Sequence, residues 1–187
     1  HIDLMQSASA ETPSEKQQEP LPQPSLKAFL SSVHQDGDKI EVRDLHRAEG
    51  GSGKQTYYFK LIDASNKEID LVVRKADKVA VRTQGAYLID REFYLLSALT
   101  DTGYLAPRPL WLGKNVTGTD GDFFIMERAA GKIPGTLLGG AEEIPEVFLL
   151  EVAEALAQLH SIELEQFTDS ITRFDSPTLL PVSNPVA

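Results

Sequence analysis

Three apolar segments with the pattern of β-strands follow one another between residues 38 and 76, and they limit the possible fold more than any other feature of the chain. In DKIEVRDL, apolar side chains alternate with charged ones, and QTYYFKLID places Tyr57, Phe59 and Leu61 on one face. IDLVVRKA is a mostly apolar run of strand-forming residues. The glycine-rich GGSG and the polar DASNKE separate the three segments. The sequence therefore predicts an antiparallel meander with glycines at its first bend.

The rest of the chain adds helices and two further strands. A short helix capped by Ser25 is expected before the meander, and a helix from about Gln84 to Thr100 after it. LWLGK and DFFIMER are typical of strands, and IPEVFLLEVAEALAQLHSI of a helix. The segment from Gln166 onward contains Pro and Ser and has no clear period. The order of elements indicates an α+β fold.

Composition excludes several classes of function. The chain has 187 residues and a net charge of -10, which argues against sequence-independent binding to nucleic acid. It has no cysteine, so disulfides and thiolate metal sites are excluded, and a reducing cytoplasm is the expected location. No apolar run is long enough for a membrane helix, and no signal peptide is evident. Residues 1–24 are expected to form a disordered tail that includes a vector remnant.

Glu92 is an unusual residue for its position in the expected helix. It lies at helical spacing from Leu88, Leu95 and Leu96, within an apolar stripe. A carboxylate in such a stripe loses several kcal/mol of hydration unless a cation contacts it. The third strand ends in Arg74 and Lys75, whose side chains point to opposite faces, and the pattern alone leaves both open as partners. A surface pair worth at most ~1 kcal/mol is the simpler alternative.

The glycine-rich bend is a candidate for contact with phosphates. AEGGSGKQT is not a Walker A motif, because Ala48 and Gln55 stand where that motif needs Gly and Ser or Thr. Glycines between two strands can still bring backbone N–H groups close to phosphates, although on the glycines alone an ordinary hairpin bend is the favoured interpretation, because such bends are common. The candidate phosphate contacts are Gly51, Ser52, Gly53 and Lys54.

Six segments in order resemble the N-terminal half of the aminoglycoside phosphotransferase (choline-kinase-like) family. They are GGSGKQTYYFKL, LVVRK, REFYLLSAL, APRPLWLG, FFIMERAAGK and EALAQLH, and they are nearest to the branch attached to acyl-CoA dehydrogenases. The resemblance implies a protein-kinase-like N-lobe over residues 25–128, with a five-stranded antiparallel sheet and one packed helix. Residues 129–187 would then form the hinge and the start of an incomplete helical C-lobe, beginning with a helix at 145–162.

The resemblance also implies roles for individual residues. Arg74 would grip the α- and β-phosphates of ATP, and Glu92 would be its ion-pair partner. In the hinge, the carbonyl of Glu127 and the N–H of Ala129 would meet the adenine edge, with Met126 lining the pocket. The chain departs from the family pattern at Arg74, where many relatives have Lys, and at Gly53 and Lys54, where relatives often have Ser and Asn.

The catalytic loop of the family is not present in this sequence. The family's His-Gly-Asp loop, the Asn five residues beyond it and the later metal-binding Asp have no counterpart, and His34–Asp36 precedes the glycine bend. We expect His160 to be a packed, hydrogen-bonded helix residue. No catalytic residue and no metal ligand is therefore assigned, and magnesium ligands are expected only in a missing C-terminal part.

The functional hypothesis is an ATP-binding portion of a small-molecule kinase that phosphorylates a hydroxyl of an unidentified acceptor. This 187-residue chain would itself be inactive. A non-catalytic kinase-like module that binds a nucleotide or a protein is the alternative, and an unrelated five-stranded α+β binding domain is a third possibility.

Overall fold

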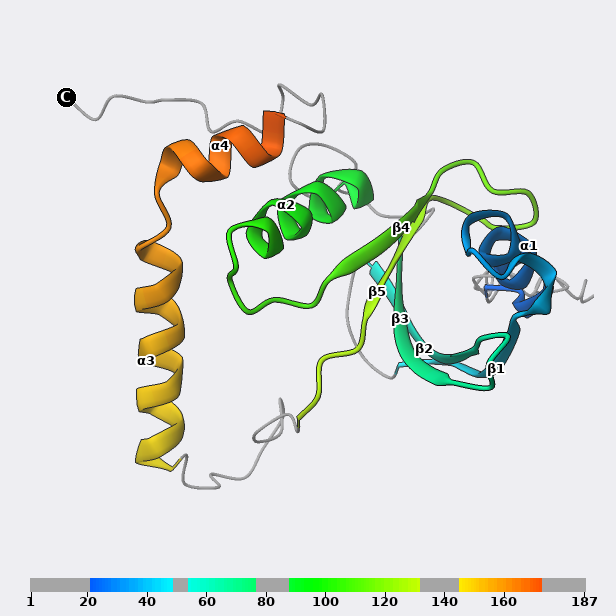
Figure 1. The fold of residues 1–187 in the computed structure, drawn as a ribbon, viewed down its shortest axis with the longest axis horizontal. Coiled ribbons are helices and arrows are strands. Elements are labelled where there is room, and N and C mark those ends of the chain that lie inside the picture. Colours follow the sequence, from blue (N-terminus) through cyan, green and yellow to red (C-terminus); the bar gives the residue numbers. More distant parts are fainter. Residues whose placement is uncertain (1–20, 49–53, 77–87, 132–144, 173–187) are drawn as a thin grey trace, which may run out of the picture.

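The computed structural model describes residues 21–48, 54–76, 88–131 and 145–172, and Figure 1 shows their arrangement. The elements are α1 (Gln23–Val33), the 3₁₀ turn η1 (Gly37–Lys39), β1 (Glu41–Arg47), β2 (Lys54–Ile62), β3 (Glu68–Ala76), α2 (Ile89–Asp101), β4 (Pro109–Gly113), β5 (Phe123–Glu127), α3 (Glu146–His160) and α4 (Leu164–Thr172).

The five strands form one antiparallel sheet in the order β1-β2-β3-β5-β4. The predicted meander is confirmed as β1, β2 and β3, and β5 pairs with β3 so that the last two strands complete the sheet. The alternation in β2 matches its burial from Lys54 to Leu61, because Gln55, Tyr57, Phe59 and Leu61 are buried and the residues between them are not. The sheet is strongly curved (Figure 1).

Helix α1 covers one face of the sheet and closes the main core. Leu26 and Leu30 of α1 are fully buried, and Phe29 packs edge-on against Phe123 of β5, with 5.0 Å between ring centroids. The buried residues of this core come from the N-terminal segment, α1, the loop before β1, and strands β1, β2, β3 and β5. They are Leu21, Leu26, Leu30, Ile40, Val42, Tyr57, Phe59, Leu61, Leu71, Val73, Phe123 and Ile125.

The N-terminal boundary differs from the prediction. Leu21 is 3% exposed and the Gln23 side chain donates a hydrogen bond to the Val42 carbonyl, so the ordered structure begins before residue 25. Helix α1 begins at Gln23 with Pro22 at its N-cap, and the predicted cap at Ser25 is wrong. Pro24 explains the earlier start, because proline fits the first turn of a helix, where no N–H partner is needed.

Helix α2 lies on the other face of the sheet. Neighbouring residues of β5 point in opposite directions, so that Phe124 meets Phe93 of α2 at a ring distance of 5.9 Å. The buried residues of α2 are Ile89 and Ala98, while Leu88 is 38% exposed. The predicted stripe through Leu88 is therefore wrong, because the helix begins one residue later, buries Ile89 and brings Phe93 against Phe124 of the sheet. The predicted helical residues 84–87 lie outside the described part of the chain.

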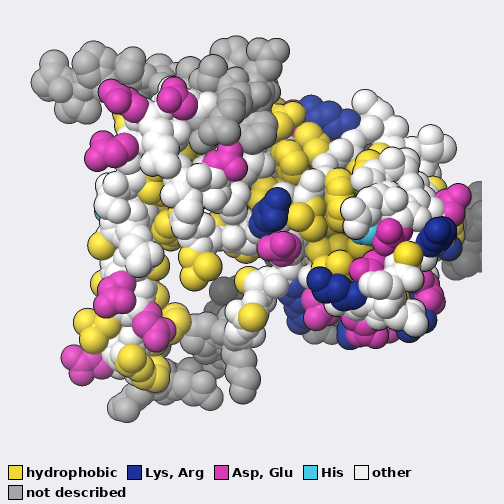
Figure 2. Space-filling view, in the orientation of Figure 1, with side chains coloured by type: hydrophobic (Ala, Val, Ile, Leu, Met, Phe, Trp, Pro, Cys, Tyr) yellow, Lys and Arg dark blue, Asp and Glu magenta, His cyan; other side chains and the backbone are white. Residues whose placement is uncertain are grey.

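The C-terminal helices stand beyond the sheet (Figure 1). Helix α3 confirms the predicted helix, yet none of its residues is buried, and Figure 2 shows apolar side chains along it. His160 is exposed at the end of α3, so its predicted packed environment is wrong. Helix α4, which packs against α2, was not predicted, although Leu164, Phe167 and Ile171 have helical spacing. Within the described ranges, no helix combines the length and apolarity needed to span a bilayer.

Candidate functional site

Side chains from three strands line the sheet face that is turned away from α1. Thr56 of β2 lies opposite Arg74 of β3, and Tyr58 lies opposite Val72, so all four share this face. Val72 in turn lies opposite Met126 of β5. The face therefore has a polar end at Thr56 and Arg74 and a more apolar end at Tyr58, Val72 and Met126.

Glu92 of α2 contacts two cations at the polar end. The Nε atom of Arg74 donates a hydrogen bond of 3.1 Å to Oε1 of Glu92, and Nη1 of Arg74 donates one of 2.9 Å to the Thr56 hydroxyl. The Nζ atom of Lys54, the first residue of β2, donates to the other carboxylate oxygen of Glu92. One carboxylate is thus shared between cations from two adjacent strands. The predicted pair of Arg74 with Glu92 is confirmed.

The cluster of Lys54, Arg74 and Glu92 is only partly buried. The side chains of Lys54, Arg74 and Glu92 are 17%, 29% and 24% exposed, so Glu92 borders the packed face of α2 instead of lying within it. A partly exposed carboxylate needs less compensation than a fully buried one, and two donors supply it here. The cost that the sequence suggested for Glu92 is accordingly smaller than a buried position would impose.

Lys75 occupies the opposite face of β3, as the alternation predicted. It is 2% exposed and lies between Gln55 of β2 and Phe123 of β5, on the side of the sheet covered by α1. Its Nζ atom is 3.5 Å from the carbonyl oxygen of Ala76, which it can reach as a donor. Lys75 is therefore part of the core and does not compete with Arg74 for Glu92.

Aromatic and cationic side chains cover the apolar end of the face. The Arg128 guanidinium lies over the Tyr58 ring at 4.5 Å from its centroid, and the ring of His46 in β1 approaches the same tyrosine at 5.6 Å. Arg128 follows β5, and its N–H donates to the Asp70 carbonyl, which extends the pairing with β3. Sequence reasoning missed Thr56, Tyr58 and Arg128, although the register of β2 with Arg74 would have placed the first two on this face.

The remaining predicted site residues divide between the hinge and the glycine bend. Glu127 ends β5, with its N–H bonded to the Arg108 carbonyl, and Ala129 is exposed just beyond the strand. Gly51, Ser52 and Gly53 lie outside the described residues. Met126, the residue before Glu127, lies on the same sheet face as the cation cluster, and the predicted roles of all these residues in binding ATP stay predictions.

Comparison with known proteins identifies the family. The model of the phosphotransferase enzyme family matches residues 44–180, which include most of β1, the other four strands, α2, α3 and α4. The chain belongs to this phosphotransferase family.

Its curated relatives are much longer proteins. Acyl-CoA dehydrogenase family member 11 from Pongo abelii is 26% identical over 146 residues, which cover 75% of this chain and 18% of that protein. Acyl-CoA dehydrogenase family member 10 from Mus musculus is 27% identical over 150 residues, covering 78% and 13%. The chain thus spans less than a fifth of the length of these relatives.

One solved structure is also similar to this chain. It belongs to a protein from Ralstonia eutropha provisionally named an aminoglycoside phosphotransferase, with 21% identity and a TM-score of 0.43. The match covers 62% of this chain and 32% of that one.

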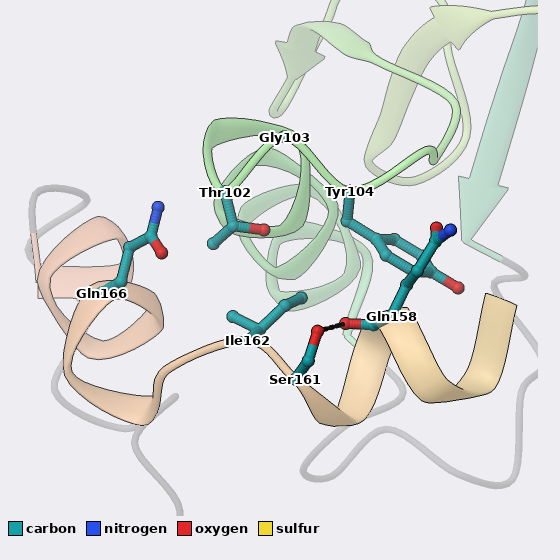
Figure 3. A pocket seen from close by; sticks show the side chains of 7 residues that line it. All are labelled: Thr102, Gly103, Tyr104, Gln158, Ser161, Ile162 and Gln166. Carbon is teal, nitrogen blue, oxygen red and sulfur yellow. Dashed lines mark hydrogen bonds between the residues drawn. The ribbon is translucent and has the colours of Figure 1, made fainter. Parts of the chain in front are cut away.

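A separate pocket lies where α2, α3 and α4 meet (Figure 3). Its volume is about 320 Å³, and hydroxyl and amide groups dominate its lining. The lining residues are Thr102, Gly103, Tyr104, Gln158, Ser161, Ile162 and Gln166. Within the described ranges, no three His, Asp or Glu side chains gather as a metal site would require. In the described part of the chain, the pocket is lined by no charged side chain and lies away from the cluster of Lys54, Arg74 and Glu92 on the sheet.

Proposed function

We propose that this chain provides the ATP-binding part of a phosphotransferase that phosphorylates a hydroxyl group of a small molecule. In this proposal Arg74 and Lys54 bind the phosphates, Glu92 orients Arg74, and the adenine lies along Tyr58, Val72 and Met126. The hinge carbonyl of Glu127 and the N–H of Ala129 would pair with the adenine edge.

The single observation that carries the proposal is the shared carboxylate. Glu92 reaches from α2 to cations on two adjacent strands, next to an apolar strip on the same sheet face. A strand cation held by a helix glutamate is the phosphate-positioning arrangement of kinase-like folds. Arg74 suits this role because a guanidinium can hold Glu92 and Thr56 and keep a fixed orientation.

The residues present fit part of the ATP molecule. Three side chains that carry two positive charges and one negative charge leave a net positive charge for phosphates, and the apolar strip suits a flat base. ATP would supply the transferable γ-phosphoryl group. We assign no magnesium ligand to the described residues, and we place the metal ligands and the catalytic base in a part of the protein that this chain does not contain. A cytoplasmic location is proposed with them, because ATP is available there.

Binding of ATP to the purified chain tests the proposal. We expect measurable but weak binding by calorimetry, and we expect Arg74→Ala to reduce the affinity at least tenfold, since it removes a charged donor to phosphate. Lys60→Ala is a suitable control, because Lys60 lies on the neighbouring strand β2 and also pairs with a glutamate, Glu68, but away from the cluster. Lys75→Ala would be a poor control, because it empties a core position.

The same preparation should show no phosphoryl transfer to any acceptor. Turnover above background would contradict the assignment of the catalytic base to another part of the protein. If the folded chain binds no nucleotide at all, the proposal fails, and a module that binds a protein partner becomes the better interpretation. The exposed apolar side chains of α3 are the feature that favours this second function.

A further inference from the structure

Glu92 does not hold its two cations equally. Arg74 lies within the central strand β3, between β2 and β5, and its guanidinium donates to both Glu92 and Thr56. Lys54 is the first residue of β2, and its ammonium group reaches Glu92 from there. Arg74 is therefore hydrogen-bonded both to α2 and to the neighbouring strand β2, whereas the Lys54 side chain extends from the end of a strand.

The chemistry of the two cations strengthens this difference. A lysine ammonium is a compact charge with three donors on a flexible four-carbon stem. A guanidinium is planar, so rotating it breaks several of its hydrogen bonds at once. The Lys54 and Glu92 side chains are 17% and 24% exposed, so water reaches both groups, and the Lys54 stem is long enough to turn its ammonium group toward another anion. Glu92 would still keep its hydrogen bond from Arg74 after such a change.

A polyphosphate offers Lys54 a better partner than Glu92 does. The phosphates of a nucleoside triphosphate carry several negative charges, and charge-assisted hydrogen bonds to them are strong. The cluster has one more cation than carboxylate, so it attracts an anion but cannot neutralise a polyanion while Lys54 stays on Glu92. Moving Lys54 to the phosphates places its charge on the part of the ligand farthest from the base.

We propose that the ammonium group of Lys54 moves from Glu92 to the terminal phosphates of a bound nucleotide. The affinity of the chain for adenine nucleotides would therefore increase with the number of phosphates. Arg74 remains on Glu92 throughout and binds the phosphates nearest the ribose. This inference rests on the proposed nucleotide function and assigns a distinct role to Lys54 within it.

Lys54→Met tests the exchange, because methionine removes the charge and keeps an unbranched side chain. Affinities for adenosine, AMP, ADP and ATP would be measured by calorimetry in EDTA, with Lys60→Met as the matched control. We expect the affinity for ATP to fall about tenfold, as loss of one charged hydrogen bond would produce. Affinities for adenosine and AMP should stay within about twofold, and Lys60→Met should change none of them.

A uniform loss for AMP and ATP would overturn the proposal, because it would show that Lys54 only supports the site structurally. An unchanged affinity for ATP would overturn it as well. If the wild-type chain binds none of the four ligands, the proposed function itself fails, and this outcome is distinct from the other two.

A measurement on the wild-type chain covers the case in which Lys54→Met does not fold. Labelling of lysines with an amine-reactive reagent, read by mass spectrometry, should show that ATP protects Lys54 more than AMP does. Lys60 in the same sample should be labelled equally with either nucleotide. Equal labelling of Lys54 with ATP and AMP would overturn the exchange.

Discussion

Helices α1 and α3 have similar apolar patterns but very different surroundings. In α1, Leu26 and Leu30 are fully buried against the sheet. In the longer α3, Leu149, Val152 and Leu156 are 54%, 42% and 49% exposed. Periodicity therefore predicts that a segment is helical, but burial depends on whether another element is available to cover its apolar face.

The difference indicates how stability is distributed along the chain. The sheet with α1 has a continuous core, so its unfolding exposes much apolar surface. Helix α3 gains little from tertiary contacts, and an isolated helix of this length is marginally stable in water. We expect the sheet and α1 to unfold together and α3 to open more readily.

The largest effect is expected from Leu30→Ala in α1. Removing this fully buried side chain should lower the free energy of unfolding by about 2–5 kcal/mol, through lost apolar burial and the cavity left behind. Urea unfolding followed by the fluorescence of Trp111 measures it, because Trp111 is the single tryptophan and packs against the core.

Leu156→Ala in α3 is the matched control for this prediction. It makes the same chemical change on a half-exposed residue, and alanine favours helix slightly more than leucine does. The free energy of unfolding should stay within about 0.5 kcal/mol of the wild type. Equal losses in the two variants would show that α3 is covered in solution and would remove the contrast between the helices.

Much of the fold was predictable because its signals are local. Alternation in β2 and β3 indicates both the strands and their faces, and it placed Arg74 and Lys75 on opposite sides of β3. The five strands and the contact of Arg74 with Glu92 follow from those faces together with the family resemblance. Whether Arg74 or Lys75 met the helix could not be decided from alternation, because both faces of β3 carry apolar residues.

Other features depend on tertiary contacts that no local pattern contains. The second cation on Glu92 comes from Lys54, which is distant in sequence and was expected to contact phosphates. Leu21 is buried although its neighbours are typical of a disordered tail. His160 is exposed because no residue of α3 is buried by a neighbouring element. The periodicity of the α3 sequence cannot show whether such a neighbour exists.

An intermediate effect is expected from Ile171→Ala in α4. Ile171 is fully buried in the helix that packs on α2, so the change should cost about 2 kcal/mol locally. Because α4 lies outside the main core, the loss should appear as earlier melting of helical signal at 222 nm. The Trp111 transition should shift much less, so the two probes should separate. Coincident transitions would place α4 in the same cooperative unit as the sheet.

The smallest effect is expected from a polar contact between α2 and the sheet. Asp90, in the first turn of α2, accepts a hydrogen bond of 2.8 Å from Lys114, just beyond β4. Burial raises the pKa of the Asp90 carboxyl, but the hydrogen bond and charge of Lys114 outweigh it, and the pKa lies below its ordinary value of 3.8. A carboxyl group with a lowered pKa in the folded state stabilises the protein when it is ionised.

Asp90→Asn should therefore lower the free energy of unfolding by at most about 1 kcal/mol at pH 7, because both side chains remain partly exposed. The difference from the wild type should be complete above the unfolded pKa, near pH 4, and should disappear as pH falls through the lower folded pKa. Urea unfolding at pH 7, 5 and 3 measures this dependence. Lys114→Gln should give the same loss at pH 7, and the double variant should lose no more than either single variant. If Asp90→Asn lowered the free energy of unfolding as much as Leu30→Ala does, α2 would be held to the sheet mainly by this ion pair. Apolar burial would then not be the feature that distinguishes the well-packed helices from α3.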